Sequence, residues 1–130
     1  MSAKKITVVG AGHVGATCSQ LLSQKELAKE VVLVDIADGI PQGKGLDQWE
    51  SAPIEGFDSR VFGASDYESS VDSDIFIVTA GIARKPGMSR DDLLKTNANV
   101  IRSVSREIAR VAPDSIIIMV TNPLDVIPQV

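Results

Sequence analysis

A chain of 130 residues, 44% hydrophobic and 23% charged, has the balance of an ordinary globular protein, and we expect one domain over residues 1–130. The formal net charge of −4 argues against nucleic acid or an anionic membrane as the main partner. The single cysteine, Cys18, excludes an intrachain disulfide and a cysteine-rich metal site, and no segment approaches the roughly twenty apolar residues of a membrane span. We therefore expect a cytoplasmic protein without a metal site.

A glycine-rich turn organises the first part of the chain. Residues 6–9 are four β-branched residues in a row and predict a buried strand, after which Gly10, Gly12 and Gly15 follow at G-x-G-x-x-G spacing. In a dinucleotide-binding turn the first glycine allows the tight bend, the second lets the backbone approach a pyrophosphate, and the third lets the helix pack on the strand. The phosphates would sit at the helix N-terminus, where unpaired N–H groups favour negative charge.

A helix is expected after this turn, over residues 13–28. Its inward face would be formed by Val14, Cys18, Leu21 and Leu22.

Asp35 completes the second predicted strand, residues 31–35, and stands twenty residues after Gly15. A carboxylate there can accept hydrogen bonds from both hydroxyls of an adenosine ribose and would repel a 2′-phosphate, which selects NAD over NADP. A solvated acid at a strand end is the alternative interpretation. The order of strand, turn, helix, strand and acid favours dinucleotide binding.

The rest of the chain continues the alternation of helices and strands. Residues 38–51 predict a helix that carries Leu46 and Trp49, although two glycines inside it would weaken it. Further elements are expected as strands at 60–62, 74–79 and 115–120, and as a long helix from Asp91 to just before Pro113 with Leu94, Ala98, Ile101, Val104, Ile108 and Val111 on one face. This order predicts an α/β fold, a doubly wound parallel sheet of the Rossmann type. Five strands are expected, so the sixth strand of a complete dinucleotide fold is absent.

Two loops at the carboxyl ends of predicted strands carry candidate ligand-binding side chains. In the first loop Arg84 and Arg90 flank a Pro-Gly pair, and two guanidinium groups could grip a dianionic substrate. In the second loop Asn122 precedes a proline. A solvated basic loop and a simple turn residue are the respective alternatives.

These motifs together resemble the lactate/malate dehydrogenase family. The resemblance is carried by the glycine turn, Asp35, the run 79–94, Asn97 and the run 121–125. Within the family, the motifs are most similar to the malate dehydrogenases of the lactate-dehydrogenase-like branch. The similarity covers essentially the whole chain, but only the N-terminal part of such enzymes, whose chains are more than twice as long.

The resemblance implies NAD as the cofactor and assigns residues to it. The pyrophosphate would be held by Gly10, Ala11, Gly12, His13, Val14 and Gly15. The adenosine ribose would be bound by Asp35, and the nicotinamide half would contact Asn97, Val120, Thr121 and Asn122.

The resemblance also implies malate and oxaloacetate as substrates of an oxidoreductase of the tricarboxylic acid cycle. Arg84 would bind the carboxylate far from the reacting carbon, a position at which lactate-specific relatives usually have glutamine. Arg90 would polarise the ketone oxygen, and Asn122 would add a hydrogen bond to the substrate. Residues 82–90 would form a lid over the site.

The family's catalytic histidine and its orienting aspartate belong to a C-terminal domain that has no counterpart in this sequence. The single histidine, His13, lies in the glycine turn and is interpreted as a helix-start residue near the pyrophosphate. The chain is therefore expected to contain no catalytic base and to be inactive by itself. Two alternatives are a non-catalytic NAD-binding module and an isolated or engineered fragment. An open edge at the fifth strand and an apolar patch around Leu46 and Trp49 predict a homo-oligomer.

Overall fold

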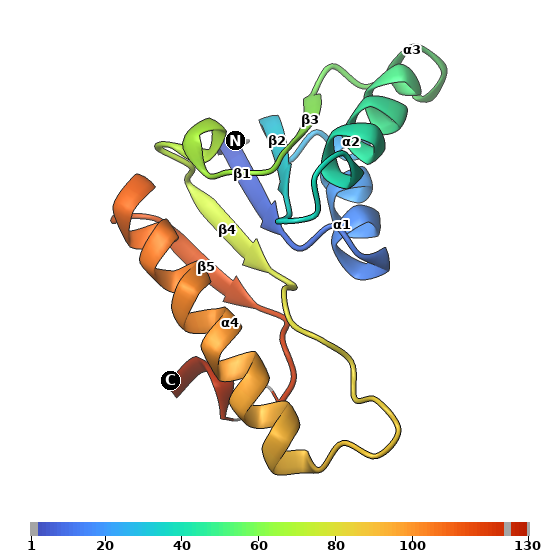
Figure 1. Cartoon of the computed structure of the whole chain (residues 1–130). Helices are drawn as coiled ribbons and strands as arrows, with labels where there is room; N and C mark the ends of the chain where they lie inside the picture. The colour runs from blue at the N-terminus through green and yellow to red at the C-terminus, as the bar shows by residue number, and fades with distance from the viewer. Residues whose placement is uncertain (1–2, 124–125, 130) are drawn as a thin grey trace.

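A computed structural model of the chain describes residues 3–123 and 126–129. These residues form one parallel sheet of five strands in the order β3-β2-β1-β4-β5, with helices on both faces (Figure 1). The strands are β1 (Ala3–Val9), β2 (Ala28–Val34), β3 (Arg60–Ala64), β4 (Ile75–Val78) and β5 (Ile116–Met119). The predicted doubly wound α/β fold is confirmed.

Four α-helices connect or flank these strands, together with two 3₁₀ turns. They are α1 (His13–Gln24), α2 (Ile40–Glu50), α3 (Ala52–Glu55), α4 (Arg90–Val111), η1 (Glu68–Ser70) and η2 (Ile127–Gln129). Figure 1 shows α1 and α2 on one side of the sheet and α4 on the other. Among the described residues no helix is both long enough and apolar enough to cross a membrane.

Alternate residues of β1 belong to two separate hydrophobic cores, one on each face of the sheet. Ile6 and Val8 pack in a cluster with Leu22 of α1, whereas Val9 packs in a cluster with Phe76 of β4 and Ile101 of α4. Since successive side chains of a strand point to opposite faces, the largely apolar run at residues 6–9 fits a sheet that is covered on both faces. β1 is the central strand of this sheet.

The predicted inward face of α1 is wrong at two positions. Val14 is 61% exposed and Leu21 is 47% exposed, while Leu22 is buried and Cys18 is partly buried. The residues of α1 that are buried are small apart from Leu22: Gly15, Ser19, Leu22 and Ser23. A helix that packs this closely on a sheet buries glycine and serine, so hydropathy alone points to the wrong face. Partial burial raises the pKa of the Cys18 thiol, which favours its protonated form.

The predicted boundaries also shift around this helix. α1 ends at Gln24 rather than at residue 28, because Glu26 adopts a left-handed conformation with φ of 52° and the Leu27 N–H bonds back to the Leu22 carbonyl. The second strand accordingly starts at Ala28, three residues before the predicted start.

The predicted helix over 38–51 is confirmed as α2, and its second inner glycine is explained by packing. A Cβ on Gly45 would lie 2.5 Å from the backbone nitrogen of Gly63 in β3. Glycine at this position lets the α2 backbone contact the strand directly, and this close approach outweighs its low helix propensity.

The long helix α4 is the element that hydropathy predicts best. Its predicted apolar face is buried at Ala98, Ile101, Val104, Ile108 and Val111, and Leu94 is partly buried. The helix begins with a capping box, in which the Ser89 hydroxyl accepts from the Asp92 N–H and the Asp92 carboxylate accepts from the Ser89 N–H.

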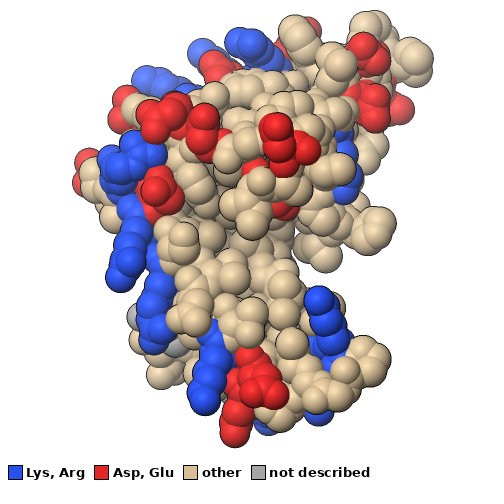
Figure 2. All heavy atoms as spheres, viewed as in Figure 1, with Lys and Arg blue, Asp and Glu red and all other residues tan. Residues whose placement is uncertain are grey.

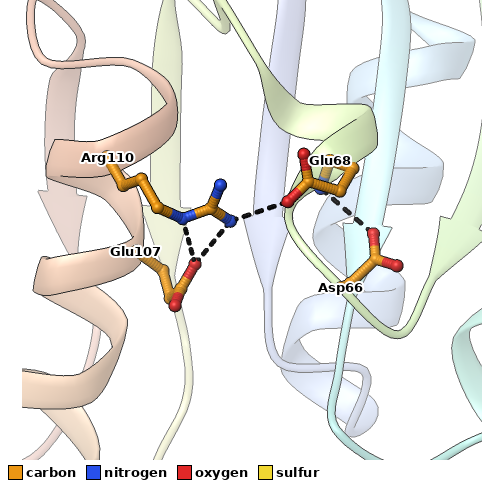
Figure 3. A network of polar contacts seen from close by, with 4 residues as sticks. All are labelled: Asp66, Glu68, Glu107 and Arg110. Atoms are coloured by element: carbon orange, nitrogen blue, oxygen red, sulfur yellow. Dashed lines mark hydrogen bonds and ion pairs between the residues drawn. The ribbon is translucent and has the colours of Figure 1, made fainter.

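An exposed ion-pair network joins the end of α4 to η1. Arg110 Nη2 lies 2.9 Å from Glu68 Oε1 and 2.7 Å from Glu107 Oε2 (Figure 3). Asp66 accepts a hydrogen bond from the backbone of Glu68 in the same network. The bonds to Glu107 and Glu68 raise the pKa of Arg110, although the three side chains are about half exposed and such surface pairs are weak.

The strand β5 lies at the edge of the sheet, and its side chains are more exposed than those of the central strand β1. Ile116 is 64% exposed, and Ile117 and Ile118 are exposed as well. The end of the predicted 121–125 motif, Leu124 and Asp125, lies outside the described residues.

Candidate functional site

The glycine turn between β1 and α1 is shaped by close contacts that exclude side chains. Gly10 has φ of +104°, and its N–H donates to the Val34 carbonyl at 2.8 Å. A Cβ on Gly10 would lie 2.6 Å from the Thr79 hydroxyl, and a Cβ on Gly15 would overlap the carbonyl of Gly10. These two glycines are therefore required by the protein's own packing.

Gly12 differs from its two neighbours because space is open around it. A Cβ on Gly12 would meet no atom within 4 Å. Gly12 is the N-cap of α1, and neither a capping side chain nor an acid in the first turn occupies the helix N-terminus. Free N–H groups at an open, positively polarised helix end fit a phosphate group, so the turn meets the steric and electrostatic requirements of a dinucleotide. His13 and Val14 are exposed at the same helix end.

Asp35 lies directly beside this turn, as the sequence predicts. Its Oδ2 accepts from the Ala11 N–H at 2.7 Å, and its Oδ1 accepts from the Ala37 N–H at 3.1 Å. A carboxylate offers about four acceptor positions, so two remain for the hydroxyls of a ribose. The acid is thus held in place by the backbone on either side of it.

A cavity of about 350 Å³ opens between the ends of β4 and β5. It is lined by Val14, Thr79, Ala80, Gly81, Ile82, Ala83, Asn97, Val120, Thr121 and Asn122. All five residues outside 79–83 were predicted to bind the cofactor. The structure therefore brings the start of α1 and the ends of β4 and β5 to one site, as expected for ligands at the carboxyl edge of a parallel sheet.

Asn97 forms part of this cavity wall but uses its amide on the protein. It is 1% exposed, its Oδ1 accepts from the Ile82 N–H at 2.9 Å, and its Nδ2 donates to the Asn122 carbonyl at 2.8 Å and to the Ile82 carbonyl at 3.4 Å. Thr121 is also buried, and its hydroxyl donates to the Ala80 carbonyl at 2.9 Å. The predicted contact of Asn97 with nicotinamide stays a prediction. Its observed contacts join the two loops that border the cavity.

Arg84 lies on the exposed loop between β4 and α4, and Arg90 lies where this loop enters the helix. Arg84 Nε donates to the Met88 carbonyl at 3.0 Å, and Arg90 is the first residue of α4. A cation at a helix N-terminus works against the helix dipole, so the position of Arg90 is not explained by helix stability. Figure 2 shows basic side chains at the lower right, where Figure 1 places this loop, across a hollow from the part that carries α1.

Two side chains of α2 that sequence reasoning missed also contact the turn region. Lys44 Nζ donates to the Ala11 carbonyl, and Gln48 Nε2 donates to the Ala16 carbonyl at 2.8 Å. Both side chains donate to backbone carbonyl oxygens, and because every residue has such an oxygen, the sequence does not show which one is the acceptor. The one available signal was the spacing of four residues, which places both side chains on one face of a helix.

No group of three or more His, Cys, Asp or Glu residues that could hold a metal ion occurs in the described part of the chain.

Comparisons with known proteins agree with this geometry. The family model described as "lactate/malate dehydrogenase, NAD binding domain" matches residues 4–130. A malate dehydrogenase of Pelodictyon phaeoclathratiforme is 60% identical over 122 residues, which are 94% of this chain and 39% of that protein. One of Desulforudis audaxviator is 56% identical over 126 residues, 97% of this chain and 40% of the relative.

Solved structures give the same result. The malate dehydrogenase of Salinibacter ruber superposes with a TM-score of 0.88 at 51% identity, over 95% of this chain and 38% of that one. The lactate dehydrogenase of Cryptosporidium parvum, in complex with lactic acid and β-nicotinamide adenine dinucleotide, gives 0.89 at 40% identity, over 98% and 40% of the two chains. This chain therefore spans about 40% of the length of the relatives it matches. It belongs to the lactate/malate dehydrogenase family, as the NAD-binding domain.

Proposed function

We propose that this chain forms the NAD site of a malate dehydrogenase, whose complete form interconverts malate and oxaloacetate. The observation that carries the proposal is the joint position of two features at one sheet edge. The open Gly12 turn has Asp35 bonded to its backbone, and the loop with Arg84 and Arg90 follows the adjacent strand. When bound, NAD supplies or accepts the hydride.

Different residues of this chain bind different parts of NAD. The N–H groups at the start of α1 bind the pyrophosphate, and Asp35 binds the adenosine ribose and repels a 2′-phosphate. Val14, Asn97, Val120, Thr121 and Asn122 border the space for the nicotinamide half.

The arginine loop supplies the substrate contacts. The Arg84 guanidinium pairs with the carboxylate remote from the reacting carbon, and Arg90 stabilises negative charge on the carbonyl oxygen. Asn122 adds a hydrogen bond to the substrate, and residues 82–90 close over it and exclude water. A dicarboxylate clamp distinguishes this proposal from a regulatory module that only senses NAD.

The proton of the substrate hydroxyl is transferred by a residue outside this chain. His13 is exposed at the start of α1, on the pyrophosphate side, and is on the wrong element for a base at the substrate carbon. We therefore propose a two-domain enzyme in which this chain is the cofactor domain, and expect the chain alone to show no malate dehydrogenase activity. Oxaloacetate-dependent oxidation of NADH by the chain, abolished by Arg90→Ala, would contradict this.

The complete enzyme is proposed to act in the tricarboxylic acid cycle, to be located in the cytoplasm and to form a homo-oligomer. Exposed apolar residues on and around α2 support self-association: Ile36, Ile40, Leu46, Trp49 and Ile54. The net charge of −4 supports a small-molecule role without nucleic acid or membrane. Light scattering at high protein concentration tests the oligomer, and a monomer mass would count against it.

Calorimetric titration of the chain with NADH and with NADPH tests the central proposal. We expect saturable NADH binding and at least about tenfold weaker NADPH binding, because the Asp35 carboxylate repels the extra phosphate. Asp35→Ser should weaken NADH binding and reduce the difference between the affinities for NADH and NADPH. A folded chain that binds neither dinucleotide would overturn the proposal.

A further inference from the structure

The helix α2 is fixed against the sheet so that one of its faces is directed at the glycine turn. Gly45 seats the helix directly on the backbone of β3. Lys44 and Gln48, four residues apart, then lie on the same face. Gln48 donates to the Ala16 carbonyl and accepts from the Ser19 hydroxyl, both at 2.8 Å, which ties α2 to α1.

Lys44 extends this attachment to the turn itself. Its ammonium group lies 2.5 Å from the Ala11 carbonyl oxygen, while the Asp35 carboxylate accepts from the Ala11 N–H. The two peptide units that flank the Ala11 Cα are therefore each held by a charged side chain, one cationic and one anionic. Hydrogen bonds with an ionised partner are stronger than neutral ones, so the two units are firmly oriented.

The orientation of one peptide unit matters for a ligand. The Ala11 carbonyl and the Gly12 N–H belong to the same trans peptide, in which the two groups point in opposite directions. With the carbonyl held on the α2 side, the Gly12 N–H points away from α2. Within the described residues no hydrogen bond uses this N–H, and the space around Gly12 is open.

A cation on the carbonyl also changes the strength of the donor. Hydrogen bonds in series polarise one another, so an ammonium group at the Ala11 oxygen withdraws electron density and makes the Gly12 N–H a stronger donor. The effect is largest toward an anionic acceptor, such as a phosphate oxygen.

We propose that Lys44 is a positioning residue of the dinucleotide site, which aims and polarises the Gly12 N–H toward a phosphate oxygen by holding the Ala11 carbonyl. The role rests on the proposed NAD binding, and it is exerted through the turn rather than through direct contact with the cofactor.

The test compares Lys44→Met and Lys44→Gln, which remove the charge, with Lys44→Arg, which keeps it. Lys29→Met is the matched control, since Lys29 is exposed on β2 and makes no side-chain hydrogen bond or ion pair with the described residues. Each variant is titrated with NAD and with ADP, its thermal midpoint is recorded, and the ¹H–¹⁵N resonance of the Gly12 amide is followed without ligand.

The neutral variants should bind NAD and ADP about tenfold more weakly, because a charge-assisted bond is lost. Lys44→Arg should stay within about threefold of the unmodified chain, and Lys29→Met within about twofold. The Gly12 amide proton should move upfield in both neutral variants even without ligand, which a general loss of stability would not produce selectively.

Two results would overturn the role of Lys44 alone. The first is a folded neutral variant that binds NAD as tightly as the unmodified chain does. The second is a Gly12 resonance that neither neutral substitution shifts. Either result would show that the lysine does not act through this peptide. Since the resonance is read without ligand, it reports on Lys44 even if a variant binds nothing. Failure of the unmodified chain to bind NAD would overturn this role together with the proposed function.

Discussion

The glycine turn and the arginine loop lie at the same edge of the sheet but are supported very differently. The turn is held from β2 through Val34 and Asp35, and from α2 through Lys44. The arginine loop is held chiefly by its own bonds, from Arg84 Nε and the Met88 N–H within residues 84–88, and by Asn97 at its base. The difference indicates that the proposed cofactor site is preorganised, whereas Arg84 in the proposed substrate loop is bonded only within its own loop.

The largest effect should come from filling the packed turn. Gly15→Ala places a Cβ on the Gly10 carbonyl, so α1 must move off β1, and we expect a loss of about 3 kcal/mol in the free energy of unfolding. Urea denaturation measures the loss, and NADH binding should disappear with it.

Gly12→Ala is the matched control, because its methyl group enters open space. We expect it to change the free energy of unfolding by less than about 1 kcal/mol, while weakening NADH binding by obstructing the pyrophosphate. Equal destabilisation by the two substitutions would mean that the turn is not packed as described.

A smaller effect is expected at the base of the arginine loop. Asn97→Ala removes the partner of the Ile82 N–H and of the Asn122 carbonyl in a part-buried site, at a cost of about 1 kcal/mol. Hydrogen exchange should quicken at Ile82 and across the loop while the Ala11 amide stays protected. Asn99→Ala, on the exposed face of the same helix, should change neither the free energy of unfolding nor the exchange rates appreciably. Faster exchange at Ala11 as well would show that the two regions are not independent.

The arginines themselves should matter to the ligand and hardly to the fold. Arg84→Gln, at an exposed position, should alter the free energy of unfolding by less than about 0.5 kcal/mol. It should remove most of any increase in NADH affinity that oxaloacetate produces, as measured by calorimetry. Arg106→Gln, on the exposed face of α4, serves as the charge-matched control. A similar loss in both variants would assign the effect to net charge and not to a clamp.

The two regions also differ in how far the sequence predicted them. The turn, Asp35 and the buried face of α4 follow from spacing and periodicity, and the structure has them where expected. The exposure of Val14 and Leu21 could not be predicted from hydropathy, because α1 approaches the sheet through Gly15, Ser19 and Ser23. The contacts of Lys44 and Asn97 end on backbone carbonyl and N–H groups distant in sequence, and such bonds leave no periodic pattern.

The smallest effect is expected at the amino ends of β1 and β4, the neighbouring strands whose carboxyl ends lead into the two regions. The Asp74 carboxylate accepts from the backbone N–H of Lys4 at 2.8 Å and of Lys5 at 3.1 Å. The bond from Lys5 and then that from Lys4 hold the pKa of Asp74 below its ordinary value of 3.8. Because the folded-state pKa is lowered, this contribution to stability is present above pH 3.8 and is lost as the pH falls through the folded-state value.

Asp74→Asn should therefore lower the urea midpoint slightly at pH 7, and the difference from the unmodified chain should shrink as the pH falls below 3.8 through the folded-state pKa. Asp72→Asn, which removes an exposed carboxylate two residues away, should show no such convergence. Both strands run directly into the site, β1 into the glycine turn and β4 into the arginine loop. If acid loosened the pairing of these strands enough to separate the two regions, NADH affinity would fall together with the midpoint. An affinity that persists while the midpoint falls would show that the turn keeps its shape through its bonds to β2 and α2 alone.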